Sequence, residues 1–196
     1  MENKHPGPLA WINELTTVFD NIHAGIDHKN VSLEDAFDEL ARRFKTVRAN
    51  KKTVWWAGNG GSAAVCAHLA QDLMNKTGIR SIHMGQTPLI TCMANDFGYG
   101  QVYAKPLGIL CDPGDLLIAI SSSGNSENIL NAVHTAKDNN VERVLLSGFD
   151  ENNGLNRMRE GLRFHVPSHV YGIVELTHEA IIHSVVETLT TEKAAE

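Results

Sequence analysis

The stretch DLLIAISSSGNSENILNAVHTAKDN, residues 115–139, combines three kinds of segment in a fixed order. An uninterrupted apolar run at 116–120 is typical of a buried strand, and the residues 121–126 that follow are small and polar. Apolar side chains then recur at Ile129, Leu130, Val133 and Ala136, the spacing of an amphipathic helix over 127–137. The stretch therefore predicts strand, turn and helix, which is the repeating unit of an α/β fold.

The turn of this unit carries four serines, Ser121, Ser122, Ser123 and Ser126. Hydroxyls and free backbone N–H groups at the start of a helix stabilise an anion, because the peptide dipoles align there. A phosphate group is the expected ligand. The alternative is structural: Ser126 caps the helix and the other serines only fill the turn.

A second turn of the same kind favours the phosphate hypothesis. In TVWWAGNGGSAAVCAHLAQDLMN, residues 53–75, a strand at 53–57 leads through Gly58, Asn59, Gly60, Gly61 and Ser62 into a helix at 63–75. The turn lacks the lysine of a P-loop and the spacing of a dinucleotide fingerprint. Two such turns in one parallel sheet predict one small phosphorylated ligand held between them.

Length and composition indicate a single soluble domain over 1–196, with a helical arm at 1–50 and an α/β core at 51–196. The net charge of −6 and the scattered basic residues argue against nucleic acid or a membrane surface as partner. We expect no signal peptide in 1–8. Cys66, Cys92 and Cys111 lack metal or redox spacing, so reduced thiols in a cytoplasmic protein are expected.

The arm is predicted to form two amphipathic helices, at 8–26 and 32–49, with Ser32 and Asp35 as a cap. Their apolar stripes need cover, and docking against a second copy of the chain would supply it. Beyond the first turn we expect strands near 80–85, 115–120, 143–147 and 162–166, with helical segments at 88–94 and 101–111. This alternation predicts a three-layer α/β/α sandwich around a parallel sheet.

Two helices carry groups suited to metal binding and proton transfer. His68 and Asp72 are four residues apart on the first, and Glu175, Glu179 and His183 follow the same spacing on the last. Imidazole and carboxylate from two helices predict a site for a divalent metal such as zinc. The alternative for the first pair is a contact on the helix surface.

Three motifs, GNGGS at 58–62, ANDFGYG at 94–100 and SSSGNS at 121–126, resemble the sugar isomerase (SIS) domain, and within it the phosphoheptose (sedoheptulose 7-phosphate) isomerases. The resemblance covers nearly the whole chain. It implies a homotetramer with its sites at subunit interfaces. It also implies a set of substrate-binding residues: Asn59, Gly60, Gly61, Ser62, Asn95, Asp96, Ser121, Ser122, Ser123, Ser126 and Glu175.

The resemblance also implies roles on the two helices. One zinc ion would be held by His68, Asp72, Glu175 and His183, with Asp72 as the catalytic base and His183 as an acid/base. The chain departs from the family at two of these positions, where Asp72 replaces Glu and Glu175 replaces Gln. It departs at two nearby positions as well, where Lys76 replaces Arg and Gly172 replaces Asp. A carboxylate one methylene shorter needs a shifted substrate or backbone to reach the same proton, and the added charge of Glu175 should tighten a cation site.

The expected activity is aldose-ketose isomerisation of a phosphorylated sugar, namely sedoheptulose 7-phosphate to D-glycero-D-manno-heptose 7-phosphate, without an organic cofactor. The serines would hold the phosphate while Asp72 and His183 move protons at carbons 1 and 2. The alternative is a non-catalytic SIS module, a sugar-phosphate sensor or a protein-binding tetramer resembling the replication-initiator-associating members. Those lose the histidine of the last helix, so the presence of both His68 and His183 favours the enzyme.

Overall fold

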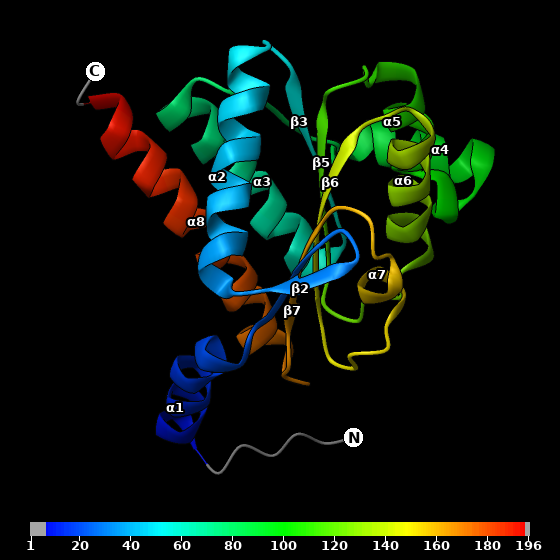
Figure 1. Cartoon of the computed structure of the whole chain (residues 1–196). Helices are drawn as coiled ribbons and strands as arrows, with labels where there is room; N and C mark the ends of the chain where they lie inside the picture. The colour runs from blue at the N-terminus through cyan, green and yellow to red at the C-terminus, as the bar shows by residue number, and fades with distance from the viewer. Residues whose placement is uncertain (1–6, 195–196) are drawn as a thin grey trace.

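The computed structural model describes residues 7–194, in which strands and helices alternate over most of the chain (Figure 1). The seven strands are β1 (His23–Ile26), β2 (Lys29–Val31), β3 (Thr53–Gly58), β4 (Arg80–His83), β5 (Leu116–Ser121), β6 (Glu142–Gly148) and β7 (Leu162–Val166). The α-helices are α1 (Pro8–Val18), α2 (Leu33–Ala49), α3 (Gly60–Thr77), α4 (Thr87–Phe97), α5 (Ala104–Leu110), α6 (Glu127–Asp138), α7 (Gly154–Arg157) and α8 (Tyr171–Ala194). Two 3-10 turns, η1 (Phe19–Asn21) and η2 (Tyr99–Gln101), complete the set.

The strands form one sheet in the order β2-β1-β7-β6-β5-β3-β4. The five strands from β3 to β7 run parallel, and the apolar runs of β3, β5, β6 and β7 are buried on both faces, as is typical of a parallel sheet, whereas the edge strand β4 is partly exposed. Adjacent tryptophans in β3 illustrate this, since Trp56 packs into the core on one face and Trp55 into the core on the other. The predicted parallel sheet is confirmed for these strands.

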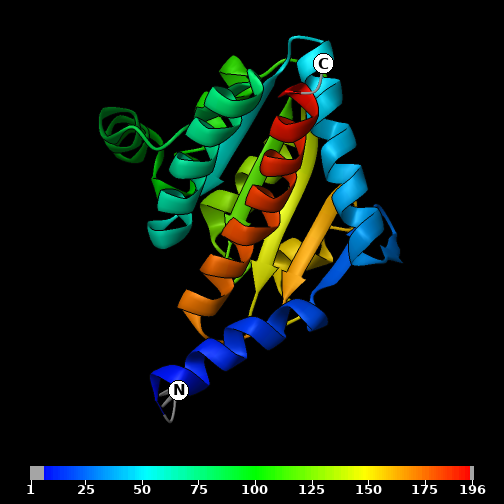
Figure 2. The same ribbon diagram turned by 90° about the vertical axis from the view of Figure 1, so that its left-hand side faces the viewer.

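Helices cover both faces of the sheet. The core on one side is closed by α1, α2, α3 and α8, and Figure 2 shows α8 lying across the middle of this face between α3 and α2. The core on the other side is closed by α4, α5, α6 and α7. The predicted three-layer sandwich is therefore confirmed. No helix among the described residues is both long and apolar enough to cross a bilayer.

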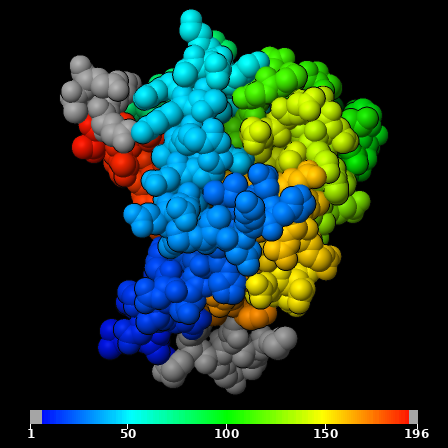
Figure 3. All heavy atoms as spheres, viewed as in Figure 1, coloured from blue at the N-terminus to red at the C-terminus, as the bar shows by residue number. Residues whose placement is uncertain are grey.

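The predicted helix at 8–26 is wrong in its second half. The α-helix ends at Val18, and residues 23–31 form a β-hairpin that extends the sheet antiparallel to β7. The free edge of β7 offers backbone partners to this segment, and tertiary pairing of this kind overrides a helical pattern in the sequence. In Figure 3 the hairpin, in blue, lies directly against the yellow-to-orange surface of the segment that joins β6 to β7.

The second predicted arm helix is confirmed as α2, with Ser32 accepting a hydrogen bond from the backbone N–H of Asp35. Its apolar stripe is covered by the chain itself, because Ala36, Leu40 and Phe44 are fully buried in the core beside the sheet. The expectation that this stripe docks on a second copy is therefore wrong. On α1, Leu9 and Ile12 remain exposed.

Two strand-to-helix turns meet at one edge of the sheet. Helix α3 follows β3 and helix α6 follows β5, and these two strands are neighbours in parallel register from Val54↔Leu116 to Gly58↔Ile120. Because parallel strands end at the same edge, the glycine turn and the serine turn lie side by side. The fold thus places the two predicted phosphate-binding turns together.

Candidate functional site

Glycines shape the turn between β3 and α3. Gly60 has a φ of 53°, in the left-handed region that residues with a side chain rarely adopt. Gly61 allows close approach of another helix, since a Cβ atom there would lie 2.3 Å from Oε1 of Glu175. Helix α3 starts at Gly60, three residues earlier than predicted, so its first backbone N–H groups belong to the turn itself.

The serine turn between β5 and α6 is largely buried. Ser121 and Ser126 share a hydrogen bond between their hydroxyls at 3.2 Å, and Ser123 accepts one from the backbone N–H of Asn125. The Ser122 hydroxyl is buried and has no partner within the described part of the chain. Buried polar groups are normally hydrogen-bonded, so an unpaired hydroxyl indicates capacity for a ligand or a water molecule.

The two turns enclose a pocket of about 350 Å³. No lysine or arginine is among the described residues that line it, so its donors are hydroxyls, amides and the backbone N–H groups of two helix starts. The pocket brings together nine of the eleven predicted substrate-binding residues, and adds Ile120 and Tyr171. Its lining comprises Asn59, Gly60, Gly61, Ser62, Ile120, Ser121, Ser122, Ser123, Ser126, Tyr171 and Glu175.

A pair of amides holds the two turns in register. Asn59 donates to Asn128 Oδ1 at 2.9 Å, and Asn128 donates back to Asn59 Oδ1 at 2.8 Å. The hydroxyl of Tyr99 donates to the same oxygen of Asn59 at 3.1 Å. Asn128 was not predicted from the sequence, because its position on α6 acquires meaning only when α3 lies beside it.

The predicted substrate residues Asn95 and Asp96 lie outside the pocket. Both are exposed on α4, where Asn95 donates to Asp96 at 2.8 Å and Asp96 accepts from the Cys92 thiol at 3.6 Å. Phe97 and Tyr99, which follow them, are also exposed. Within one chain only Tyr99 of this segment reaches the glycine turn, through its hydrogen bond to Asn59, and Asn95 and Asp96 do not line the pocket.

A cluster of ionisable side chains lies further along α3, facing α8. One ligand atom each from His68, Asp72 and His183 lies within 4.8 Å of the others, and the two imidazole rings are 5.1 Å apart between centroids. Two imidazole nitrogens and a carboxylate oxygen are a donor set that zinc prefers. His68 is six residues after Ser62 on the same helix, less than two turns and roughly 9 Å along its axis.

Asp72 is buried and paired. Lys76, one turn later, lies 2.8 Å from Oδ2 of Asp72 and also reaches Glu187 at 2.5 Å. The hydrogen bond from Lys76, helped by its charge, lowers the pKa of Asp72 below the usual value. Asp72 is therefore ionised at neutral pH, as a metal ligand or a general base must be, and His183 Nδ1 lies 3.7 Å from it.

The two glutamates of α8 have different surroundings. Oε1 of Glu179 lies 3.8 Å from His68 and 3.7 Å from His183, so its carboxylate faces both imidazoles. Glu175, one turn earlier, lines the pocket between the two turns instead and is not in the group formed by His68, Asp72 and His183. Burial raises the pKa of Glu175. The structure thus separates Glu175 from the metal-ligand set predicted for it.

A buried histidine, which lies between these two glutamates in the chain, anchors α8 to the sheet. His178 is fully buried and bonds through Nε2 to the backbone carbonyl of Ser147 at 3.0 Å. The hydroxyl of Ser147 contacts Nδ1 of His165 at 3.2 Å and accepts a hydrogen bond from the side-chain amide of Asn153. The sequence offered no signal for this network.

Comparison with known proteins places these features in a family. Residues 18–148 match the family described as SIS domain. A phosphoheptose isomerase of Akkermansia muciniphila is 32% identical over 189 residues, which cover 92% of this chain and 95% of that protein. Another, from Shewanella denitrificans, is 31% identical over 165 residues, 81% of this chain and 84% of the relative.

Solved structures share the fold. A phosphoheptose isomerase from Francisella tularensis has a TM-score of 0.81 at 25% identity, covering 93% of this chain and 96% of that one. The Vibrio vulnificus NanR protein complexed with ManNAc-6P covers 92% of this chain and 59% of that one, with a TM-score of 0.64 at 16% identity. The second likeness concerns the fold alone. By sequence and by architecture, the chain belongs to the SIS domain family and, within it, to the group that contains the phosphoheptose isomerases.

Proposed function

We propose that this protein is an aldose-ketose isomerase that converts sedoheptulose 7-phosphate to D-glycero-D-manno-heptose 7-phosphate. The observation that carries the proposal is the arrangement along α3. Its first turn lines a pocket suited to phosphate, and two and three turns later His68 and Asp72 meet His183. A phosphate bound at one end leaves the carbonyl end of a seven-carbon sugar free to reach the other.

The pocket accounts for phosphate recognition. Residues at the starts of α3 and α6 line the pocket, so their free backbone N–H groups can donate to an anion, and the hydroxyls of Ser121, Ser122 and Ser123 add donors. The unpaired Ser122 hydroxyl gains a partner when phosphate binds. Glu175, whose pKa burial raises, suits the part of the substrate that carries hydroxyl groups.

One zinc ion is the metal that the cluster fits best, held by His68, Asp72 and His183. When bound, zinc supplies a Lewis acid that polarises the carbonyl of the substrate. Glu179 faces both imidazoles and orients them as an outer carboxylate. We assign Glu175 to the substrate rather than to the metal, because it lines the phosphate pocket.

Proton transfer falls to Asp72 and His183. Asp72 is ionised, and a carboxylate is the base suited to removing the proton from the carbon beside the carbonyl. His183, 3.7 Å from Asp72, is placed to carry a proton to or from a substrate oxygen. Lys76 lowers the basicity of Asp72 while it fixes the carboxylate, so activation of the substrate is needed for transfer.

We further propose a cytoplasmic homotetramer with sites completed by neighbouring copies. Asn95 and Asp96 are exposed and do not line the pocket of their own chain, so they would contact substrate only from another copy. Exposed apolar side chains on α1, η2 and α8, namely Leu9, Ile12, Tyr99 and Leu176, suit such contacts. The three cysteines are free thiols, which fits a reducing compartment.

The test is isomerisation itself. Purified protein incubated with sedoheptulose 7-phosphate in deuterated water should incorporate deuterium at carbon 2 and form the aldose, and metal analysis should find zinc. Light scattering should give the mass of four chains. A protein that binds sugar phosphates but exchanges no proton with any of the C5 to C7 ketose phosphates would instead be the sensor, and the isomerase proposal would fail.

A further inference from the structure

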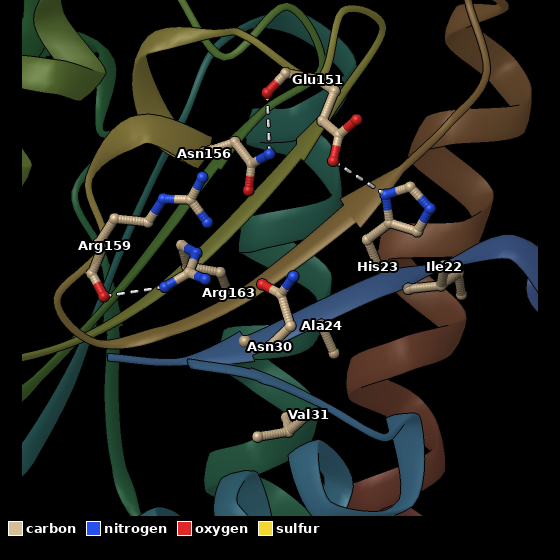
Figure 4. A pocket seen from close by; sticks show the side chains of 10 residues that line it. Ile22, His23, Ala24, Asn30, Val31, Glu151, Asn156, Arg159 and Arg163 are labelled. Carbon is tan, nitrogen blue, oxygen red and sulfur yellow. Dashed lines mark hydrogen bonds and ion pairs between the residues drawn. The ribbon is translucent and has the colours of Figure 1, made fainter. Parts of the chain in front are cut away.

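A second cavity, the hairpin cavity, lies against the β1–β2 hairpin (Figure 4). It shares no lining residue with the serine pocket, the pocket between the glycine turn and the serine turn. Its volume is about 320 Å³. The hairpin forms one wall, and the segment between β6 and β7 forms the other. The side chains that matter for its chemistry are His23, Asn30, Glu151, Asn156, Arg159 and Arg163.

Arg163 is the unusual member of this cavity. It stands in β7, is only 3% exposed, and donates to the backbone carbonyls of Asp27 and Arg159. Among the described residues no carboxylate forms an ion pair with it, and its buried Nε–H has no partner. A buried guanidinium normally pairs with an anion, because desolvating an uncompensated charge is costly.

The surroundings of Arg163 make room for its guanidinium group next to β1. A Cβ atom on Gly25 would lie 2.1 Å from the Nη2 atom of Arg163, so the glycine lets the guanidinium lie against β1. Burial, and then the neighbouring charge of Arg159, lower the pKa of Arg163, and the carboxylate of Asp27 offsets this only in part. Two guanidinium groups near each other repel until an anion lies between them.

The rest of the wall can bind hydroxyl groups. The amides of Asn30 and Asn156 can both donate and accept, and Asn156 uses one N–H for the backbone carbonyl of Glu151. The carboxylate of Glu151 lies 3.3 Å from Nδ1 of His23 (Figure 4). Guanidinium forks match phosphate oxygens in geometry and charge. We propose that the hairpin cavity is a second anion site, which takes a small phosphorylated metabolite with its phosphoryl group on Arg163 and Arg159 and its hydroxyls on the amides.

Inorganic phosphate is the probe, and glycine amides report where it binds. The chain has 16 glycines, so selective ¹⁵N-glycine labelling gives a short spectrum. Gly25 lines the hairpin cavity, whereas Gly60 and Gly61 line the serine pocket. The two sites are therefore read separately in one titration, and sodium chloride at equal ionic strength controls for screening.

The Gly25 signal should move along a saturating curve with phosphate and not with chloride. Arg159→Gln removes an exposed cation and should weaken this binding at least about fivefold, the loss expected for one charge-assisted hydrogen bond near solvent. Arg157→Gln is the matched control. Arg157 is also exposed, lies two residues away and does not line the cavity, so the affinity read at Gly25 should stay within about twofold.

Arg163→Lys keeps the charge but loses the fork, and should also weaken binding at Gly25 while leaving the Gly60 response intact. The proposal is overturned if Gly25 does not move, if its shift never saturates, or if Arg159→Gln and Arg157→Gln bind phosphate alike. Failure at Gly60 alone would count against the serine pocket and not against this cavity.

Discussion

The two ends of helix α3 present contrasting chemistry. Its N-terminal turn lines a pocket whose donors are hydroxyls, amides and backbone N–H groups, with the carboxylate of Glu175 and without a lysine or arginine among its described lining residues. Two to three turns later, His68 and Asp72 lie among charged groups from α8 and beside Lys76. Neutral donors can hold a phosphate in place without trapping it, whereas proton transfer needs charged groups at short range. The contrast predicts that binding and turnover can be altered separately.

The largest effect is expected at the charged end. Asp72→Asn removes the proposed base and should lower kcat by about a thousandfold, while the affinity for sugar phosphate stays within about twofold. Deuterium exchange at carbon 2 measures the first quantity and calorimetry the second. Asp138→Asn, an exposed change at the end of α6, is the matched control and should leave both unchanged.

The assignment of Asp72 as the base would be contradicted if the Asp72→Asn variant lost zinc affinity but kept turnover. Glu175→Gln or Glu179→Gln should then lose turnover instead, since these carboxylates are the other candidates on α8. Asp72→Glu adds a sharper contrast. Under the ordinary phosphoheptose mechanism its rate stays level or rises, whereas a site shaped around the shorter side chain loses about a hundredfold for a displacement of roughly 1 Å.

The metal ligands should give the next largest effect. His68→Ala and His183→Ala each remove one of three donor atoms, and each should weaken zinc binding by about a hundredfold or more. The gain in melting temperature on adding zinc should disappear with them. His134→Ala, an exposed histidine of α6, should keep that gain. Equal zinc affinity in all three variants and the wild type would show that His68 and His183 are not metal ligands.

The hydrogen bond from His178 to Ser147, which anchors α8 to the sheet, should make the stability of the fold depend on pH. Burial lowers the pKa of His178 from 6.5 to about 4, so in the folded state the ring stays neutral and Nε2 donates to Ser147. The unfolded chain binds a proton between these values, so this contribution is complete above pH 6.5 and is lost as the pH falls toward 4. The loss should amount to about 3 kcal/mol.

Denaturant unfolding at several pH values measures this slope. His178→Gln keeps a donor for the carbonyl but does not titrate, so its stability should fall less steeply below pH 6.5 than that of the wild type. His165 contributes a part of the slope that remains, because burial lowers its pKa as well. His134→Gln serves as the control. A slope in His178→Gln as steep as in the wild type would show that His178 does not stay neutral in the fold.

The smallest effect is expected at the N-terminal end of α3. Ser123→Ala removes a single hydroxyl from the phosphate pocket and should weaken sugar-phosphate binding by about tenfold, with little change in kcat. Ser184→Ala, an exposed serine of α8, is the matched control. Calorimetric affinity equal in the two variants would remove Ser123 from the phosphate site and weaken the contrast between the ends of α3.

Much of the fold followed from local pattern. Apolar runs predicted β3, β5, β6 and β7, and the glycine and serine turns predicted that two helix starts meet at one edge. The N-terminal hairpin did not follow, because residues 23–26 carry the apolar spacing of a helix and become a strand only against the open edge of β7. Local spacing cannot reveal a partner that lies about 140 residues away in the chain.

By itself the sequence determined which helices carry the reactive groups, because spacing of four residues places side chains on one face: His68 with Asp72, and Glu179 with His183. Only the tertiary structure decided which of those groups meet. The packing of α8 against α3 brings His183 to Asp72, turns Glu175 toward Gly61 and the phosphate pocket, and leaves Asn95 and Asp96 outside it. The reason is geometric, since periodicity fixes directions within a helix, whereas the position of one helix along another depends on how all their side chains pack.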